Sequence, residues 1–236
     1  MREDRQGVGA MKARRAPLVT VVAALLALLW ASPAAADIAP LSAPTWKNNT
    51  TLGTTTRPYV WFTTSVPVGD RRSRIRDGFT QWNNVGEPLQ YSFAGSDYGN
   101  YDPMTSCGPT SNSVFLHWTR IDGGGGVLGQ ANYCYRTYNG ISARTTAWIQ
   151  FDSAEEWCTG TGDCFDGVFG AGANMDLWSV ATHESGHVSA LGHFNGSSSI
   201  CGDNADQATM CPSYKPGTER MRSLSSSDVA SLRYYY

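Results

Sequence analysis

The strongest constraint on this chain is one short segment that contains three of its four histidines. His183, His187 and His193, with Glu184 directly after the first, read H-E-x-x-H followed by a third histidine six residues later. On an α-helix, positions i and i+4 share a face, so His183 and His187 can reach the same metal ion. His193 can join them only if the chain turns after His187. The segment therefore predicts a helix that ends in a turn at a metal site.

The residue types in this segment indicate which metal and which chemistry. Three imidazole ligands with an open fourth position are typical of a catalytic zinc ion. Glu184 follows the first ligand, where a carboxylate can take a proton from a water molecule. A bare H-E-x-x-H also occurs on surface helices without metal, but the third histidine at this spacing favours a metal site. We therefore predict one catalytic zinc, with Glu184 as general base.

The N-terminal residues 1–36 have the pattern of a secretory signal peptide. Met11–Arg15 is basic, Leu18–Trp30 is almost entirely apolar, and small residues precede Asp37. We expect cleavage after Ala36 and release of a secreted, extracellular protein. The alternative is a retained membrane anchor, but the apolar stretch is short of the roughly 20 residues that a span needs.

The chain has six cysteines, all after the predicted signal peptide. An even number in an exported protein indicates three disulfides, and a cysteine-based metal site is disfavoured because no C-x-x-C is present. Fifteen pairings are possible for six cysteines. Short loops favour two pairs and leave a third: Cys158–Cys164, Cys201–Cys211 and Cys107–Cys134.

Composition restricts the partners. Eighteen basic and 20 acidic residues give a formal net charge of −2, with no basic cluster after the signal segment. Nucleic acid and anionic membranes are therefore not expected partners of the mature protein. We expect a monomer that acts on a protein or peptide substrate.

The pattern along the chain predicts one domain of α/β (α+β) class. Residues 37–57, rich in Pro, Thr and Asn, are expected to form a loosely held N-terminal arm, and 58–236 the catalytic domain. Segments of strand pattern and of helix pattern both occur in the catalytic part. We expect a twisted mixed sheet with an active-site helix and a C-terminal helix, the arrangement implied by the family resemblance given below. The expected strands are 58–65, 89–93, 113–118, 127–135 and 145–151; the expected helices are 70–84, 175–190 and 225–235. Asp70, Asn174, and Ser225 or Ser226 are the candidate N-caps.

Beyond the zinc motif, three further segments carry a resemblance to a known family. Thr209–Tyr214 contains a methionine followed by Cys-Pro-Ser-Tyr, Leu224–Val229 has a serine-rich helix start, and Ile121–Leu128 pairs with the acidic stretch Phe151–Glu155. With the zinc helix and its lead-in Leu177–Thr182, they make residues 58–236 resemble the matrixin branch of the metzincin zinc endopeptidases, in the form of a secreted bacterial enzyme.

The resemblance assigns roles to these segments. It implies that Met210 lies under the zinc site and that Pro212 and Tyr214 shape the substrate pocket. An edge position for the strand 145–151 would let it pair with an extended substrate. It also implies a structural calcium site, with side-chain ligands Asp122, Asp152 and Glu155 and backbone carbonyl ligands Gly123, Gly125 and Val127.

The chain departs from the family pattern in three places. Ala190 stands where matrixins have a glycine, although a left-handed alanine costs on the order of 1 kcal/mol. Gln130 and Gln150 replace two histidines of the family's second zinc site, so we expect that zinc to be absent. No cysteine-bearing propeptide motif lies within 37–57, so latency through a cysteine is not expected. His117, the remaining histidine, is interpreted as structural or surface.

Three other functions remain open. The first is a catalytically silent zinc-binding module of the same fold, against which the retention of Glu184 argues. The second is an exported structural or adhesive domain with an accidental motif, which predicts no tightly bound zinc. The third is another zinc hydrolase, such as a peptidoglycan amidase, which seldom combines this histidine spacing with such a methionine segment.

Overall fold

The computed structural model describes residues 38–99, 107, 112–160, 164, 175–195, 199–201, 207–214 and 217–236. All of them belong to the compact unit Ala36–Tyr236. The predicted signal peptide and the candidate helix cap Asn174 lie outside these ranges. None of the helices within them has the length and apolar content of a membrane span.

A five-stranded mixed sheet forms one layer of the domain, as predicted. Its strand order is β2-β1-β3-β5-β4, in which only the β4–β5 pairing is antiparallel. The strands are β1 (Tyr59–Phe62), β2 (Ser92–Phe93), β3 (Ser113–Thr119), β4 (Gly129–Tyr138) and β5 (Ile141–Asp152). Two further short strands, β6 (Trp157–Cys158) and β7 (Met175–Asp176), pair with each other.

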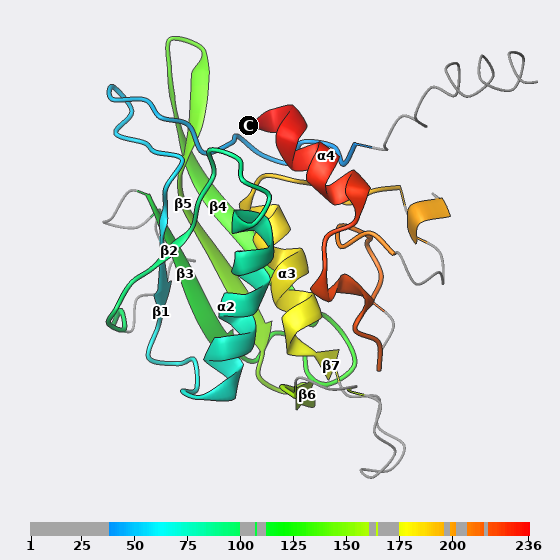
Figure 1. Cartoon of the computed structure of the whole chain (residues 1–236). Coiled ribbons are helices and arrows are strands. Elements are labelled where there is room, and N and C mark those ends of the chain that lie inside the picture. Colours follow the sequence, from blue (N-terminus) through cyan, green and yellow to red (C-terminus); the bar gives the residue numbers. More distant parts are fainter. Residues whose placement is uncertain are drawn as a thin grey trace, which may run out of the picture. The chain divides into compact units, whose positions relative to one another are not determined.

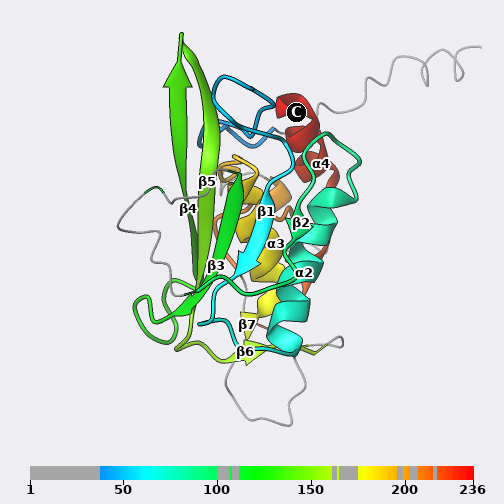
Figure 2. The ribbon, with the colours of Figure 1, turned by 90° about the vertical axis from the view of Figure 1, so that its left-hand side faces the viewer.

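The sheet edge differs from the expectation for residues 145–151. That segment belongs to β5, which lies between β3 and β4, so β4 is the edge strand. Every β5 residue from Ala143 to Asp152 is buried, which explains its nearly continuous run of apolar and β-branched residues. The turn Asn139-Gly140 has positive φ at both residues, as a tight two-residue hairpin requires. Figure 2 shows the long β4–β5 hairpin from the side.

Helices α2 (Asp70–Asn83) and α3 (Leu177–Val188) lie side by side on one face of the sheet (Figures 1 and 2). The third helix, α4 (Ser226–Tyr235), ends the chain, and 3-10 turns η2 (Ser199–Cys201) and η3 (Arg220–Arg222) precede it. Helix α2 contributes three large side chains at helical spacing to the core between sheet and helices, namely Ile75, Phe79 and Trp82.

Two of the expected helix caps were placed wrongly. Gly69 occupies the N-cap of α2, so Asp70 is the first helical residue and makes no cap bond. The N-cap of α3 is Asp176, whose carboxylate accepts the Ser179 N–H at 3.0 Å. Ser225 caps α4 and forms a capping box with Asp228, as one of the two predicted alternatives had it.

The N-terminal segment is held more closely than a loose arm. Ala39 and Trp46 are fully buried. The Ala39 N–H donates to Ser231 Oγ at 2.8 Å, and Trp46 Nε1 donates to the carbonyl of Val188 at 2.9 Å. Residues 39–46 are therefore part of the folded domain, and they run along the C-terminal end of α3.

Three disulfides cross-link the domain, in the pairs that loop length favoured. They are Cys107–Cys134, Cys158–Cys164 and Cys201–Cys211. The third bond joins η2, which follows His193 in the chain, to the segment that contains Met210.

The packing of α2 on α3 depends on a close backbone approach at Gly78. A Cβ at this position would lie 2.7 Å from the backbone of Ala181 and Thr182. We predict that Gly78→Ala lowers the free energy of unfolding by about 1–3 kcal/mol, because the overpacking outweighs the gain in helix propensity. Urea denaturation measures this change. Ser73→Ala on the exposed side of α2 is the control, and an unchanged midpoint for Gly78→Ala would contradict the prediction.

Candidate metal centre and active site

Helix α3 presents two of the three histidines on one face and ends in a turn. Ala190 has φ +73°, its N–H donates to the His187 carbonyl at 2.9 Å, and the Leu191 N–H donates to the Gly186 carbonyl at 3.1 Å. These two bonds form a Schellman motif with alanine in the left-handed position. The chain therefore makes the turn that the family makes with glycine, and it continues to His193.

Gly192 has a different role from the one that glycine has in such a turn. A Cβ on Gly192 would lie 3.0 Å from the Pro40 carbonyl oxygen. The Gly192 N–H donates to that same oxygen at 2.6 Å. Gly192 thus lets the N-terminal segment approach the turn.

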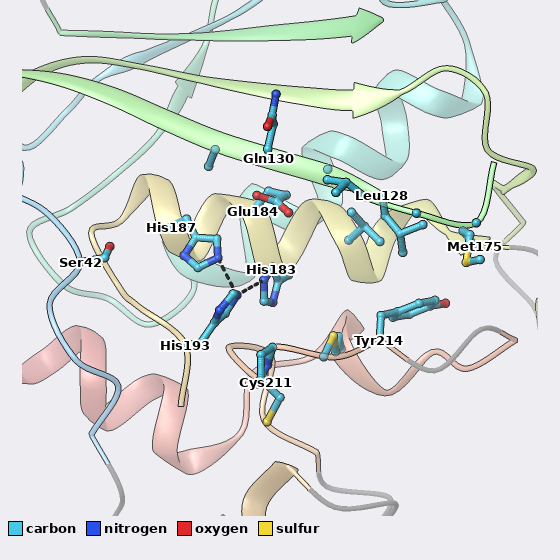
Figure 3. Close-up of a pocket in the computed structure, with 18 of the residues that line it drawn as sticks. Ser42, Leu128, Gln130, Met175, His183, Glu184, His187, His193, Cys211 and Tyr214 are labelled. Atoms are coloured by element: carbon cyan, nitrogen blue, oxygen red, sulfur yellow. Dashed lines mark hydrogen bonds between the residues drawn. The ribbon is translucent and has the colours of Figure 1, made fainter. Parts of the chain in front are cut away.

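The three imidazole rings converge at one point (Figure 3). His193 Nε2 lies 3.0 Å from the Nε2 atoms of both His183 and His187. His183 Nδ1 is 2.6 Å from the Thr209 carbonyl and His187 Nδ1 is 2.8 Å from the Leu191 carbonyl. Because a carbonyl only accepts, each Nδ1 carries the proton and each Nε2 lone pair faces the point of convergence.

The electrostatics of the three rings suit a metal ion. Burial, reinforced by His187, lowers the pKa of His183 to about 3, and burial lowers that of His187 to about 4. Burial also lowers the pKa of His193. All three rings are neutral at pH 7, which is the form that binds a metal. The three neutral nitrogen atoms lie within 4.8 Å of one another, close enough to bind a single zinc ion.

Glu184 lies beside the histidines with part of its carboxylate unused. Its side chain is buried, and within the described residues Oε2 has no hydrogen-bond partner. Burial raises the pKa of Glu184 to about 8. A nearby cation lowers such a pKa again, which brings the group toward the range of a general base. A Cβ on Gly129 would lie 3.1 Å from Glu184 Oε1, so this glycine leaves room for the carboxylate.

The segment under the zinc helix is anchored by Asp228. Its two carboxylate oxygens accept the N–H groups of Thr209 at 2.8 Å and Met210 at 3.1 Å. Met210 is fully buried, and a Cβ on Gly186 would lie 2.2 Å from its Sδ. Met210 therefore supports α3 from behind and does not line the cavity. Asp228 was predicted only to lie within the helix start Leu224–Val229, so this anchor was missed.

A cavity runs from the histidines between β4 and the segment after Met210. Pro212 and Tyr214 line it, as expected, together with apolar side chains that the sequence analysis did not single out: Leu128, Met175, Val180 and Met221. Figure 3 shows Tyr214, Leu128 and Met175 together at one end. This end is suited to an apolar side chain of a ligand.

The wall of this cavity is tied to the start of α3. The Asp176 N–H donates to Tyr214 Oη at 2.9 Å, and that hydroxyl donates to the Thr218 carbonyl at 2.7 Å. Asp176 is fully buried and forms a two-pronged ion pair with Arg222, with both contacts at 2.8 Å. Arg222 also pairs with Glu219 at 2.9 Å, whereas removing Arg222 would leave the buried Asp176 carboxylate without a cation, so this arginine fixes the pocket wall relative to the helix.

The expected calcium loop uses its carboxylates in another way. Val127 N–H donates to Asp122 at 3.1 Å, Gly123 N–H to Asp152 at 3.2 Å and Gly125 N–H to Glu155 at 2.7 Å. The amides of these three residues therefore bind the acids. Within the described ranges, the three carboxylates are not among the groups close enough to share an ion. Burial raises the pKa of Asp152, but the hydrogen bonds that its carboxylate accepts from backbone amides lower it by more. The net pKa is therefore below its usual range.

The two glutamines that replace histidines of a second zinc site pair with each other. Gln130 Nε2 donates to Gln150 Oε1 across β4 and β5. His117 is next to Gln150 in register on β3 and lies apart from the three converging histidines. An amide pair therefore occupies this place in the sheet.

The fold and the site together have the arrangement of a metzincin domain: a mixed sheet, a helix that carries two histidines and a buried glutamate, and a third histidine beyond a turn. The sequence matches the matrixin family over residues 45–236, so this chain belongs to that family. It is 32% identical to the protein named Metalloendoproteinase 1-MMP of Arabidopsis thaliana over 172 residues. The match covers 71% of this chain but only 38% of that relative.

The turn after α3 gives a specific test. We predict that Ala190→Gly changes the free energy of unfolding by less than about 1 kcal/mol, because relief of the left-handed strain offsets the lost methyl burial. Ala190→Val should cost more than about 2 kcal/mol, since a β-branched residue strongly resists positive φ. Chemical denaturation of both variants measures the difference. Equal stability of the two would show that the turn is not held in the left-handed conformation.

Proposed function

We propose that this chain is a secreted zinc-dependent endopeptidase that hydrolyses peptide bonds of protein substrates. The observation that carries the proposal is the convergence of three neutral imidazoles next to a buried carboxylate with a free oxygen. Membership of the matrixin family supports it independently. When bound, the zinc ion would polarise a substrate carbonyl and make a water molecule more acidic.

The chain's own residues supply the proton transfers and the binding. Glu184 accepts a proton as the water attacks and returns one to the leaving amine. Its burial excludes competing solvent from the carboxylate. His183 and His187 keep their orientation because their Nδ1–H groups are bound to the carbonyls of Thr209 and Leu191.

The edge strand β4 is the best candidate for binding the substrate backbone. Its residues Gly129, Gln130, Ala131 and Tyr133 line the cavity next to the histidines. An extended peptide can add to such an edge through main-chain hydrogen bonds, with little dependence on its sequence. The apolar end at Tyr214 and Leu128 would then take the side chain that follows the cleaved bond.

Glu184→Gln tests the role of the carboxylate. The amide has the same size but no basicity, so we expect cleavage of casein to fall at least about 100-fold while zinc content stays unchanged. Turnover assays and metal analysis of both proteins give the two readouts. Glu156→Gln, which changes an exposed acid away from the cavity, is the matched control and should retain activity.

Other results of the Glu184→Gln experiment would favour a different function or contradict the proposed one. Zinc in both proteins without cleavage by either would favour the silent zinc-binding module. Cleavage by Glu184→Gln at the parent rate would exclude this residue as the general base. No zinc in the parent would contradict the proposal as a whole.

The proposal also includes export from the cell and a calcium ion at the Asp122 loop. Export is supported by the basic and apolar N-terminal pattern and by three disulfides, which persist in oxidising compartments.

A calcium ion at the loop with Asp122 and Glu155 stays a prediction. If it binds, calcium at 100 times its dissociation constant should stabilise the fold by about 2.7 kcal/mol. Melting temperatures in calcium and in EGTA measure this, and equal values would show that the loop needs no ion.

A further inference from the structure

The C-terminal end of α3 is contacted by one buried arginine and by the N-terminal segment, residues 39–46. Arg144, near the start of β5, has no exposed surface. Its Nη1 donates to the His187 carbonyl at 2.9 Å and also to the Val188 carbonyl. Its Nε donates to the Pro44 carbonyl at 3.2 Å. One guanidinium thus connects the sheet, the end of α3 and the N-terminal segment.

Arg144 has no acidic partner among the described residues. Its surroundings are the ring of Tyr133, centred 4.5 Å from the guanidinium carbon, the more distant ring of Trp46, and backbone carbonyls. A buried charge without a counter-ion is costly, so its position calls for a physical reason. The carbonyls at a helix C-terminus carry partial negative charge, and a cation there is stabilised by the helix dipole.

The N-terminal segment binds the next carbonyls of the same turn. Trp46 Nε1 donates to Val188 at 2.9 Å, and the Ser42 N–H donates to Ala190 at 2.9 Å. The single proton of Ser42 Oγ is shared between the Leu191 carbonyl at 3.1 Å and the Ala190 carbonyl at 3.2 Å. The Leu191 carbonyl is the one that orients His187 through Nδ1, so Ser42 acts on a histidine ring through a single shared oxygen.

We propose that Ser42, Trp46 and Arg144 form a clamp that positions His187 and His193 for metal binding. The clamp holds the turn at Ala190, whose left-handed backbone would otherwise relax and carry His193 away from the other two rings. These three are positioning residues: Trp46 and Arg144 do not line the cavity, and Ser42, which does line it, acts on the turn through backbone carbonyls. The inference deepens the proposed function and rests on it.

The clamp predicts a loss of zinc affinity that exceeds any loss of stability. Arg144→Met removes the donors but keeps most of the buried stem. Produced from the full chain in an exporting host, it should bind zinc about 10- to 100-fold more weakly, as when other groups that orient metal ligands are removed. Arg144→Lys, which retains the charge, should recover part of this loss. Competition with a chromogenic chelator measures the affinity.

Two controls separate positioning from general destabilisation. Arg136→Met changes an exposed arginine that faces Ala143, directly before Arg144, across the strand pair, and should leave zinc affinity unchanged. Ile75→Val weakens the core of α2 away from the clamp and serves as the variant of lowered stability. Arg144→Met should bind zinc more weakly than Ile75→Val at a temperature where both are folded.

A milder variant keeps the test decisive if Arg144→Met does not fold. Ser42 is exposed, so Ser42→Ala should fold normally yet bind zinc about two- to tenfold more weakly, the value of one or two hydrogen bonds. For the zinc-saturated enzyme, kcat should fall in Arg144→Met with little change in KM.

Two results would contradict, respectively, the clamp and the proposed function. Zinc affinity in Arg144→Met and Ser42→Ala equal to that of the parent, with zinc bound and casein cleaved by all three, would overturn the clamp and leave the proposed function intact. Absence of zinc binding by the parent would instead contradict the proposed function.

Discussion

The turn that follows Val188 is the constraint on which the rest of the site depends. Two histidines on a helix face are a local property of α3, but the third reaches them only because the chain reverses at Ala190. That reversal places a non-glycine residue in the left-handed region, at a cost of about 1–2 kcal/mol. The surrounding structure offsets it with the Schellman bonds and with donors to the carbonyls of the turn.

Segments that are far apart in the sequence hold this turn in place. Residues 39–46 pass along it from the N-terminal side, Arg144 reaches it from the sheet, and Asp228 in α4 fixes the segment that binds His183. The zinc site is therefore at the meeting point of elements that are far apart in sequence. Packing of α3 on α2 at Gly78 fixes the helix itself, so the rings are oriented before any metal arrives.

Much of this could be predicted from the sequence, for identifiable reasons. Periodicity and turn residues predicted the mixed sheet and the three helices, because each element buries one face at its own period. The histidine spacing predicted the ring convergence, and the short loops favoured the disulfide pairs that are present. The resemblance placed Ala190 at the glycine position of the turn but left its conformation open, and the structure has it left-handed.

The errors have a common physical origin. The order of strands in a sheet is set by tertiary pairing, so the pattern of 145–151 could not show that β4 is the edge. Arg144 and Asp228 act through backbone groups of remote segments, which leave no periodic signal. The available hint for Arg144 was that it is the one basic residue of β5. For the Gly-rich loop at Asp122, the sequence does not show which way each peptide plane faces, and the calcium site there stays a prediction.

Anomalous diffraction at the zinc absorption edge, from crystals of the mature protein grown with zinc, would test the central claim most directly. The account predicts one zinc ion per chain, bound by Nε2 of His183, His187 and His193, and no second ion between Gln130 and Gln150. It also predicts that Ala190 keeps its positive φ in the bound state. A zinc ion bound without His193, or a turn after Val188 that releases this residue from the other two, would contradict it.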